Sequence, residues 1–178
     1  MRTLLAAAAI AVASSVAGAG TSAAPLQAPY ALTAEHAELD AALRAVAAMP
    51  GPVGEAARAA VDLVAPHVAL EERIVLPLLG LAPALLEGAP VAEAEDALAR
   101  TDALKADLPR IMEDYPQMVS ALTDLFAAAE AEGRPEISRL ADRMIRHAIG
   151  DIEIGYPAAI LIGDQLRARL AAERRNES

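Results

Sequence analysis

The stretch that decides the fold is His67-Val-Ala-Leu-Glu71-Glu72-Arg-Ile-Val-Leu76-Pro77. On an α-helix, residues four apart lie on the same face, so His67 and Glu71 are predicted to project together. A similar stretch returns 80 positions later, where His147 is followed by Asp151 and then by Pro157. Each stretch has a histidine, an acid at the fourth position after it and a proline at the tenth. We therefore expect two helices that each present an imidazole and a carboxylate on one face.

The composition narrows the fold and the classes of partner. At 178 residues the chain is long enough for one domain with a substantial core. Aromatic residues make up only 2%, which favours packed helices over a sheet. The net charge of −10 argues against binding to nucleic acid or to an anionic membrane surface, because both need clustered Lys and Arg. Without cysteine there is no disulfide framework and no thiol nucleophile, so any metal must be held by nitrogen and oxygen.

The N-terminus has the features of a secretory signal peptide over residues 1–23. Arg2 gives a positive start, residues 4–12 form an apolar run, and small residues follow. The small-x-small cleavage rule fits after Ala19 and after Ala23, so the mature domain is expected to span residues 24–178 and to be periplasmic or secreted. The alternative is an uncleaved N-terminal anchor, although the apolar run is short and rich in alanine for a membrane span.

Apolar periodicity and Gly/Pro punctuation predict four helical regions, at about residues 33–48, 53–79, 93–132 and 135–172. Thr33 is the expected N-cap of the first. Prolines inside the other three are expected to kink or interrupt them: Pro66, Pro109, Pro116 and Pro157. The expected inward faces include Phe126 in the third region and Ile154 in the fourth. Four helices with mostly short loops predict an all-α protein, an antiparallel up-down-up-down four-helix bundle with proline-kinked helices.

Polar residues on the apolar faces of such a bundle would meet at one central site. The candidates are His36, His67, Glu71, His147 and Asp151, from three of the four helices. Three imidazoles and two carboxylates suit iron, manganese or zinc. The alternative is a buried hydrogen-bonded cluster without metal, since a lone histidine or an i,i+4 His–Glu pair is often only a packing or polar contact. Burial of five titratable groups is costly unless they are paired, and the two matched stretches favour a metal site. Glu38, Glu72 and Glu153 are expected on the solvated face or as acceptors for the imidazoles.

These residues carry a resemblance to the hemerythrin-like, or HHE cation-binding, domain. It rests on His36 with Glu38, on both histidine–acid stretches, and on flanking stretches such as residues 50–54 and 129–135, and it extends over about residues 30–170. The resemblance implies a four-helix bundle that holds one or two non-haem irons between the helices. It also implies O₂ as a ligand, or a role in oxygen or iron sensing, storage or stress response.

Two positions depart from the pattern of that family. Tyr115 stands where the third helix is expected to carry a histidine, and Asp151 stands where a longer Glu is usual, with Ile152 in place of a second acid. Because a phenolate can ligate ferric iron, Tyr115 joins the candidate ligands, although a buried tyrosine more often only forms a hydrogen bond. The alternative function is therefore a degenerate, metal-free bundle with a structural or protein-interaction role.

No nucleophile, phosphate-loop or dinucleotide motif points to an enzyme.

Overall fold

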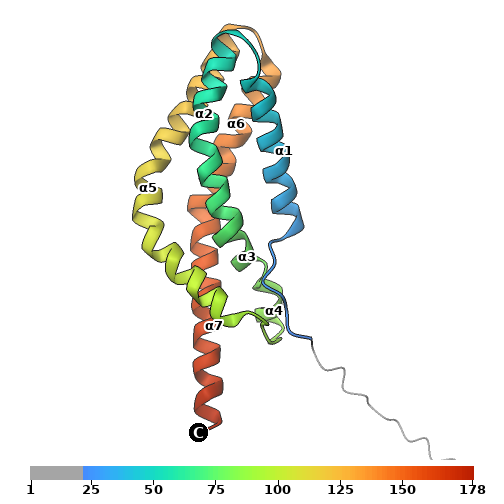
Figure 1. Ribbon diagram of the computed structural model, residues 1–178, viewed down its shortest axis with the longest axis vertical. Coiled ribbons are helices and arrows are strands. Elements are labelled where there is room, and N and C mark those ends of the chain that lie inside the picture. Colours follow the sequence, from blue (N-terminus) through green and yellow to red (C-terminus); the bar gives the residue numbers. More distant parts are fainter. Residues whose placement is uncertain (1–21) are drawn as a thin grey trace, which may run out of the picture.

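The computed structural model describes residues 22–178, and over that range the fold is all-helical apart from one isolated bridge between Ala24 and Val91. The predicted signal peptide lies almost entirely outside the described residues. Among residues 22–178, no helix is both long and apolar enough to cross a membrane. The expectation of an all-α helical bundle is confirmed (Figure 1).

The helical segments are, in chain order, α1 (Tyr30–Ala47), α2 (Gly51–Leu70), η1 (Glu71–Val75), α3 (Leu76–Leu79), α4 (Ala82–Leu86), α5 (Ala94–Ala131), α6 (Pro135–Gly150), η2 (Asp151–Gly155) and α7 (Tyr156–Asn176). The two η segments are single π-helical turns within longer helices, so α2–η1–α3 and α6–η2–α7 each run on as one helix (Figure 1). With α1 and α5 they make up the four predicted helical regions.

Two short connections lie at the same end of the bundle, one joining α1 to α2 and one joining α5 to α6 (Figure 1). Each uses a glycine in the left-handed region, Gly51 with φ 85° and Gly133 with φ 65°. Residues with a Cβ rarely adopt that conformation, so glycine lets the chain reverse within a few residues. Gly133 follows the C-cap of α5, so the third helical region ends within one residue of the predicted boundary at about residue 132.

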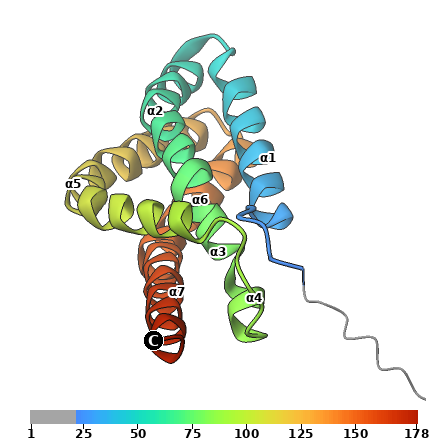
Figure 2. The same cartoon turned by 60° about the horizontal axis from the view of Figure 1, so that its bottom comes forward.

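Prolines lie inside the helices without breaking them. Pro66 lies inside α2 without breaking it, and α5 continues through Pro109 and Pro116 as one helix of 38 residues. The prediction that the third region is interrupted was therefore wrong. A proline removes one backbone hydrogen bond, but packing of α5 against α2 and α6 holds the helix together on both sides. The visible result is a bow in α5 (Figures 1 and 2).

Two further local predictions were wrong. Thr33 is not an N-cap, because α1 begins at Tyr30 and the Thr33 hydroxyl donates to the Tyr30 carbonyl oxygen at 3.0 Å. Pro29 already holds an extended backbone there and fixes the start of the helix one turn earlier. Phe126 is 37% exposed on the outside of α5. The positions in α5 that face the core are instead Met118, Leu122 and Leu125.

The hydrophobic core is divided into two clusters along the bundle. One lies among α1, α2, α5 and α6 and includes Leu43, Val53, Leu122 and Ala141. The other lies around α3, α5 and α7 and includes Leu78, Leu104, Tyr156 and Leu166. On the helix that runs from α2 to α3, the first cluster ends and the second begins beside His67 and Glu71, and on the helix that runs from α6 to α7 the same change occurs beside His147 and Asp151. The polar residues therefore occupy the layer between two apolar cores.

Candidate metal centre

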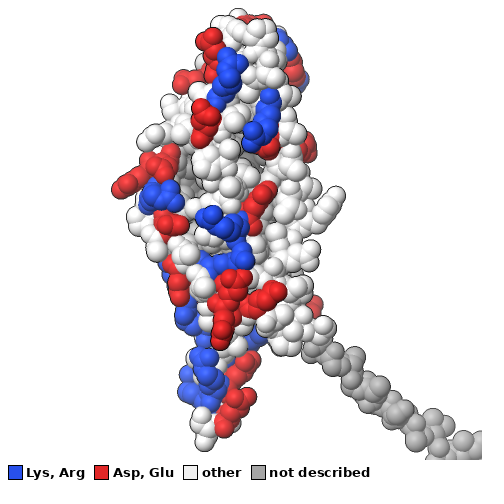
Figure 3. All heavy atoms as spheres, viewed as in Figure 1, with Lys and Arg blue, Asp and Glu red and all other residues white. Residues whose placement is uncertain are grey.

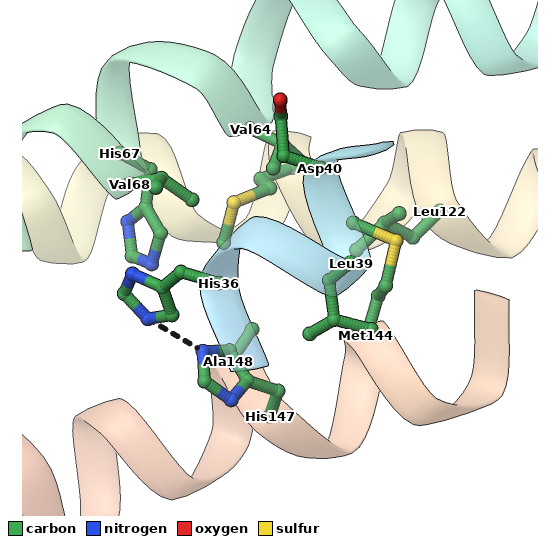
Figure 4. A pocket seen from close by; sticks show the side chains of 11 residues that line it. His36, Leu39, Asp40, Val64, His67, Val68, Leu122, Met144, His147 and Ala148 are labelled. Carbon is green, nitrogen blue, oxygen red and sulfur yellow. Dashed lines mark hydrogen bonds between the residues drawn. The ribbon is translucent and has the colours of Figure 1, made fainter. Parts of the chain in front are cut away.

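All five histidine and carboxylate residues predicted from the sequence converge in that layer. His36 comes from α1, His67 and Glu71 from the α2–η1 helix, and His147 and Asp151 from the α6–η2 helix. The three imidazoles lie one above another and face a common space (Figure 4). Their donor atoms fall into two groups, within each of which the atoms lie within 4.8 Å of one another: His36, Glu71 and His147 in one, and His67, Glu71 and Asp151 in the other. Glu71 belongs to both groups.

Glu71 is the centre of this arrangement. Its side chain is 1% exposed, and its two oxygens face different imidazoles. Oε1 lies 3.2 Å from His67 Nε2, and Oε2 lies 3.6 Å from His36 Nε2. A carboxylate oriented in this way can bind two ions, one with each oxygen, or a single ion with either.

Asp151 reaches the same space from the opposite helix. Its Oδ2 lies 3.6 Å from His147 Nε2 and 3.9 Å from His67 Nε2. The shorter arm of Asp therefore still faces an imidazole from each of the two groups. His147 Nε2 also lies 3.1 Å from His36 Nε2, so one of these two nitrogens carries a proton or both face a shared cation.

Several of the converging atoms have no hydrogen-bond partner within residues 22–178. These buried atoms are His67 Nε2, Glu71 Oε2 and Asp151 Oδ2, and His36 Nδ1, on the side of its ring that faces Glu72, also has no partner. A buried polar atom without a partner is destabilising by about 1–3 kcal/mol, and native proteins contain few of them. His67 Nε2 and Asp151 Oδ2 lie 3.9 Å apart, and Glu71 Oε2 lies 3.6 Å from His36 Nε2. A cation in each of the two donor groups would therefore pair these atoms. The donor set therefore fits a metal ion bound by nitrogen and oxygen.

The electrostatics of the layer also suit a cation. Burial lowers the pKa of His67, but the Asp151 and Glu71 carboxylates outweigh it and raise that pKa to about 9. Burial raises the pKa of Glu71, yet contacts with His67, Tyr156 and His36 hold it below its usual value. Burial and the charge of Glu71 raise the pKa of Asp151 despite the nearby histidines. The site therefore attracts positive charge, from a proton or from a metal ion.

Tyr156 is a site residue that the sequence did not reveal. It is 1% exposed, and its hydroxyl donates to Glu71 Oε1 at 2.8 Å. The predicted inward residue of this turn was Ile154, which is instead 69% exposed. That prediction was wrong because it assumed a regular α-helix. The π-turn contains one extra residue, so the positions after it rotate and Tyr156 takes the inward face that Asp151 also occupies.

A proline follows each π-turn, at the second position of the α-helix that continues from it. The backbone N–H groups of Leu76 and Tyr156 bond to the carbonyls five residues earlier, at Glu71 and Asp151. The next residue in each stretch is a proline, which has no N–H to donate to the carbonyl four residues before it. In the first stretch that carbonyl belongs to Arg73, and it accepts from the guanidinium of Arg100 instead. A proline alone does not produce such a turn, since Pro66, Pro109 and Pro116 lie in regular α-helix.

Tyr115 lies on α5 beside this layer. Its hydroxyl is buried and has no hydrogen-bond partner in the described part of the chain. Burial and the charges of Asp151 and Glu153 raise the pKa of Tyr115, which disfavours the phenolate in the absence of a metal. Tyr115 lines a cleft that also reaches His67. The structure thus places Tyr115 next to the His67 side of the site.

The histidines also border a small apolar cavity of about 20 Å³, large enough for one water-sized molecule (Figure 4). Its other walls are mainly Leu39, Val64, Met118, Leu122 and Met144.

Acidic residues surround the layer on its outer side. Glu72 Oε1 lies 3.6 Å from His36 Nδ1, and Glu35 Oε2 lies 3.8 Å from His147 Nδ1. Both are close enough to orient an imidazole after a small side-chain movement. Glu38 is instead bonded to Arg143 at 2.7 Å.

No family model, curated protein or solved structure matches this chain.

Proposed function

We propose that this protein is a hemerythrin-like metal-binding protein that holds non-haem iron, as one or two ions, within an antiparallel up-down-up-down four-helix bundle. The observation that carries the proposal is the convergence of three imidazoles and two carboxylates, with several of their buried atoms unpaired in the described structure. The nitrogen and oxygen donors and the absence of cysteine favour iron, manganese or zinc over copper(I).

The geometry suggests how the donors would be shared. His36, His147 and Glu71 Oε2 would hold one ion, and His67, Glu71 Oε1 and Asp151 would hold a second. Bound iron would supply a coordination position for O₂ and one-electron redox chemistry. Tyr156 orients Glu71, and the two apolar clusters flank the layer along the bundle. The small apolar cavity beside the histidines is suited to a molecule the size of O₂.

A second candidate function is a metal-free bundle with a structural or protein-interaction role. It is favoured by the hydrogen bond from Tyr156 to Glu71 and by the contact of His36 with His147, which pair part of the layer without any ion. In that case the polar layer would contribute specificity of packing only.

Metal content distinguishes the two functions. The mature protein is purified, loaded anaerobically with Fe(II), desalted and analysed for iron, alongside Glu71→Gln and the exposed control Glu38→Gln. The proposal predicts near-stoichiometric iron in the wild type and in Glu38→Gln, and little in Glu71→Gln. Air oxidation should then give near-UV absorption, and a Tyr115–iron(III) bond would add a visible band that Tyr115→Phe abolishes. Wild-type protein that stays empty after loading would leave only the structural role.

We also propose that the protein acts in the periplasm or outside the cell, after removal of residues 1–23. N-terminal sequencing of protein recovered from a periplasmic or culture fraction tests this. Mature protein that begins between about residue 20 and residue 24 is the expected result. Recovery of the full chain in the membrane fraction would favour the uncleaved anchor.

A further inference from the structure

A cleft of about 490 Å³ opens between α2 and α5, on the side of the metal site where Tyr115 stands. Its position coincides with the bow in α5, since Tyr115 lies between Pro109 and Pro116 (Figure 1). Its inner wall includes His67, and Tyr115 closes part of the same wall. The volume is in the range of sites that take small organic molecules. The cleft therefore connects solvent to one edge of the candidate metal centre.

The rim of this cleft is basic, which is unusual for a chain with a net charge of −10. Arg73 and Arg110 line it, and Asp114 is the acid that lines it with them. Arg110 contacts Asp114 at 3.3 Å and Asp107 at 3.9 Å, and its side chain remains 61% exposed. Arg73 forms no ion pair within the described residues. Basic side chains over α2 and α5 are visible on this face of the molecule, among acidic ones (Figure 3).

Two other clefts reach the metal-site histidines, and their charges differ. The cleft beside His147 has Arg143 and Arg146, but it also has the acids Glu35 and Asp151, and Arg143 is already bonded to Glu38. The cleft between α1 and α2 is lined by Asp40 and Glu72 and by one arginine, which bonds to Asp40. An anion is therefore received best between α2 and α5.

The walls of the cleft between α2 and α5 combine apolar and polar groups. Its apolar surface comes from Leu63, Leu70, Ile111 and Met118. The Gln117 amide can donate a hydrogen bond to a ligand, whereas the Tyr115 hydroxyl is buried and its ring lines the wall. A fully hydrated inorganic ion would leave the apolar walls in contact with water. A ligand with a charged end and an apolar body matches both parts of the lining.

We propose that this cleft binds a small organic anion, a monocarboxylate with an apolar body. Its carboxylate is received by Arg73 and Arg110 at the rim, and its body lies on Ile111 and Met118 beside Tyr115 and His67. Guanidinium groups bind carboxylates with charge-assisted hydrogen bonds that are about twice as strong as neutral ones. The placement of the ligand next to a metal rests on the proposed function, whereas its binding to the cleft does not.

Ligand-observed NMR with benzoate and hexanoate on the full mature protein tests this proposal, with or without iron. Binding with a dissociation constant in the range of about 1 mM or tighter is expected, and Arg73→Ala should weaken it about tenfold, the loss of one charge-assisted contact. Arg146→Ala, in the cleft beside His147, is the matched control and should bind as the wild type does. Benzyl alcohol, which lacks the charge, should bind at least about tenfold more weakly than benzoate.

Each outcome supports or overturns the proposal. Equal binding by wild type and Arg73→Ala, a loss in Arg146→Ala alone, or no binding of either acid up to about 10 mM would overturn it. Inorganic phosphate that binds as tightly as benzoate would show that the apolar walls do not select the ligand, and would overturn the organic class. In Fe(II)-loaded protein, faster relaxation of the benzoate protons than in metal-free protein is expected. If the protein takes up no iron, the proposed function fails. The effect of Arg73→Ala on benzoate binding still shows whether the cleft binds the anion.

Discussion

The two histidine–acid stretches have the same spacing and the same backbone, but their acids have different environments. Both continue from an α-helix into a π-turn that begins at the acid, and both have a proline after that turn. Glu71 is 1% exposed, lies between two imidazoles and accepts a hydrogen bond from Tyr156. Asp151 is 19% exposed, and its Oδ2 has no hydrogen-bond partner in the described structure. The same local pattern therefore yields one fixed carboxylate and one free carboxylate.

The difference arises because Tyr156 belongs to one stretch but bonds to the acid of the other. The π-turn after Asp151 turns Tyr156 inward, where it meets Glu71 across the bundle. The residue at the equivalent place in the first stretch is Leu76, which can only pack. Under the proposed function, Glu71 is the fixed ligand and Asp151 the adjustable one. Four predictions test this comparison.

The largest expected difference is in metal affinity. Glu71→Gln should weaken iron binding by more than about 100-fold, because Glu71 faces both groups of donors. Loss of a residue that only supports a metal ligand costs about 10- to 100-fold in affinity. Asp151→Asn should weaken it by about tenfold, since the group formed by His36, Glu71 and His147 survives. Competition with a chelator measures both. Equal losses in the two variants would contradict the distinction between a fixed and an adjustable ligand.

The pairing of His67 with the two acids predicts a pH dependence in the metal-free protein. Because the pKa of folded His67 is raised to about 9, its contribution to stability is complete below about pH 6.5 and is lost as the pH rises through 9. The loss is on the order of 3 kcal/mol. Urea unfolding in the presence of a chelator, from pH 6 to pH 10, measures it. His67→Gln should flatten that decline, and an unchanged decline in the variant would locate the titrating group elsewhere.

Tyr156→Phe removes the hydroxyl that fixes Glu71. The variant should lose about 1–3 kcal/mol of unfolding free energy in the metal-free state, because a buried carboxylate oxygen loses its donor. Iron affinity should fall by about tenfold, as for other residues that orient a ligand. Urea unfolding and chelator competition measure the two effects. A variant with full stability and full affinity would show that Glu71 needs no positioning.

Tyr115→Phe should have the smallest effect and is the matched control for Tyr156→Phe. The Tyr115 hydroxyl is buried without a hydrogen-bond partner in the part of the chain that the structure describes, so its removal should stabilise the metal-free protein by about 1 kcal/mol, the lower end of the cost of such a group. The measurement is again urea unfolding. A loss as large as that of Tyr156→Phe would show that the Tyr115 hydroxyl does have a partner in solution.

Much of the fold and of the candidate site could be predicted from local patterns. Apolar periodicity and the loop glycines placed the four helical regions, and the i,i+4 spacing brought His67 together with Glu71 and His147 with Asp151. Predictions failed where they assumed that helices are either regular or broken. Phe126 and Ile154 were placed inside, and Pro109 and Pro116 were expected to interrupt α5. Packing held α5 together, and a π-turn changed the rotation of the helix that carries Ile154.

The sequence by itself determined the helices, the nitrogen and oxygen donors and their spacing within each helix, because these depend on contacts between near neighbours in the chain. Only the tertiary structure decided which donors meet across helices and which acid is fixed. The bond from Tyr156 to Glu71 joins residues 85 positions apart, and it forms only because one extra residue in a π-turn rotates Tyr156 toward the centre of the bundle. The difference between His67–Glu71 and His147–Asp151 therefore comes from packing between helices rather than from the spacing that the two stretches share.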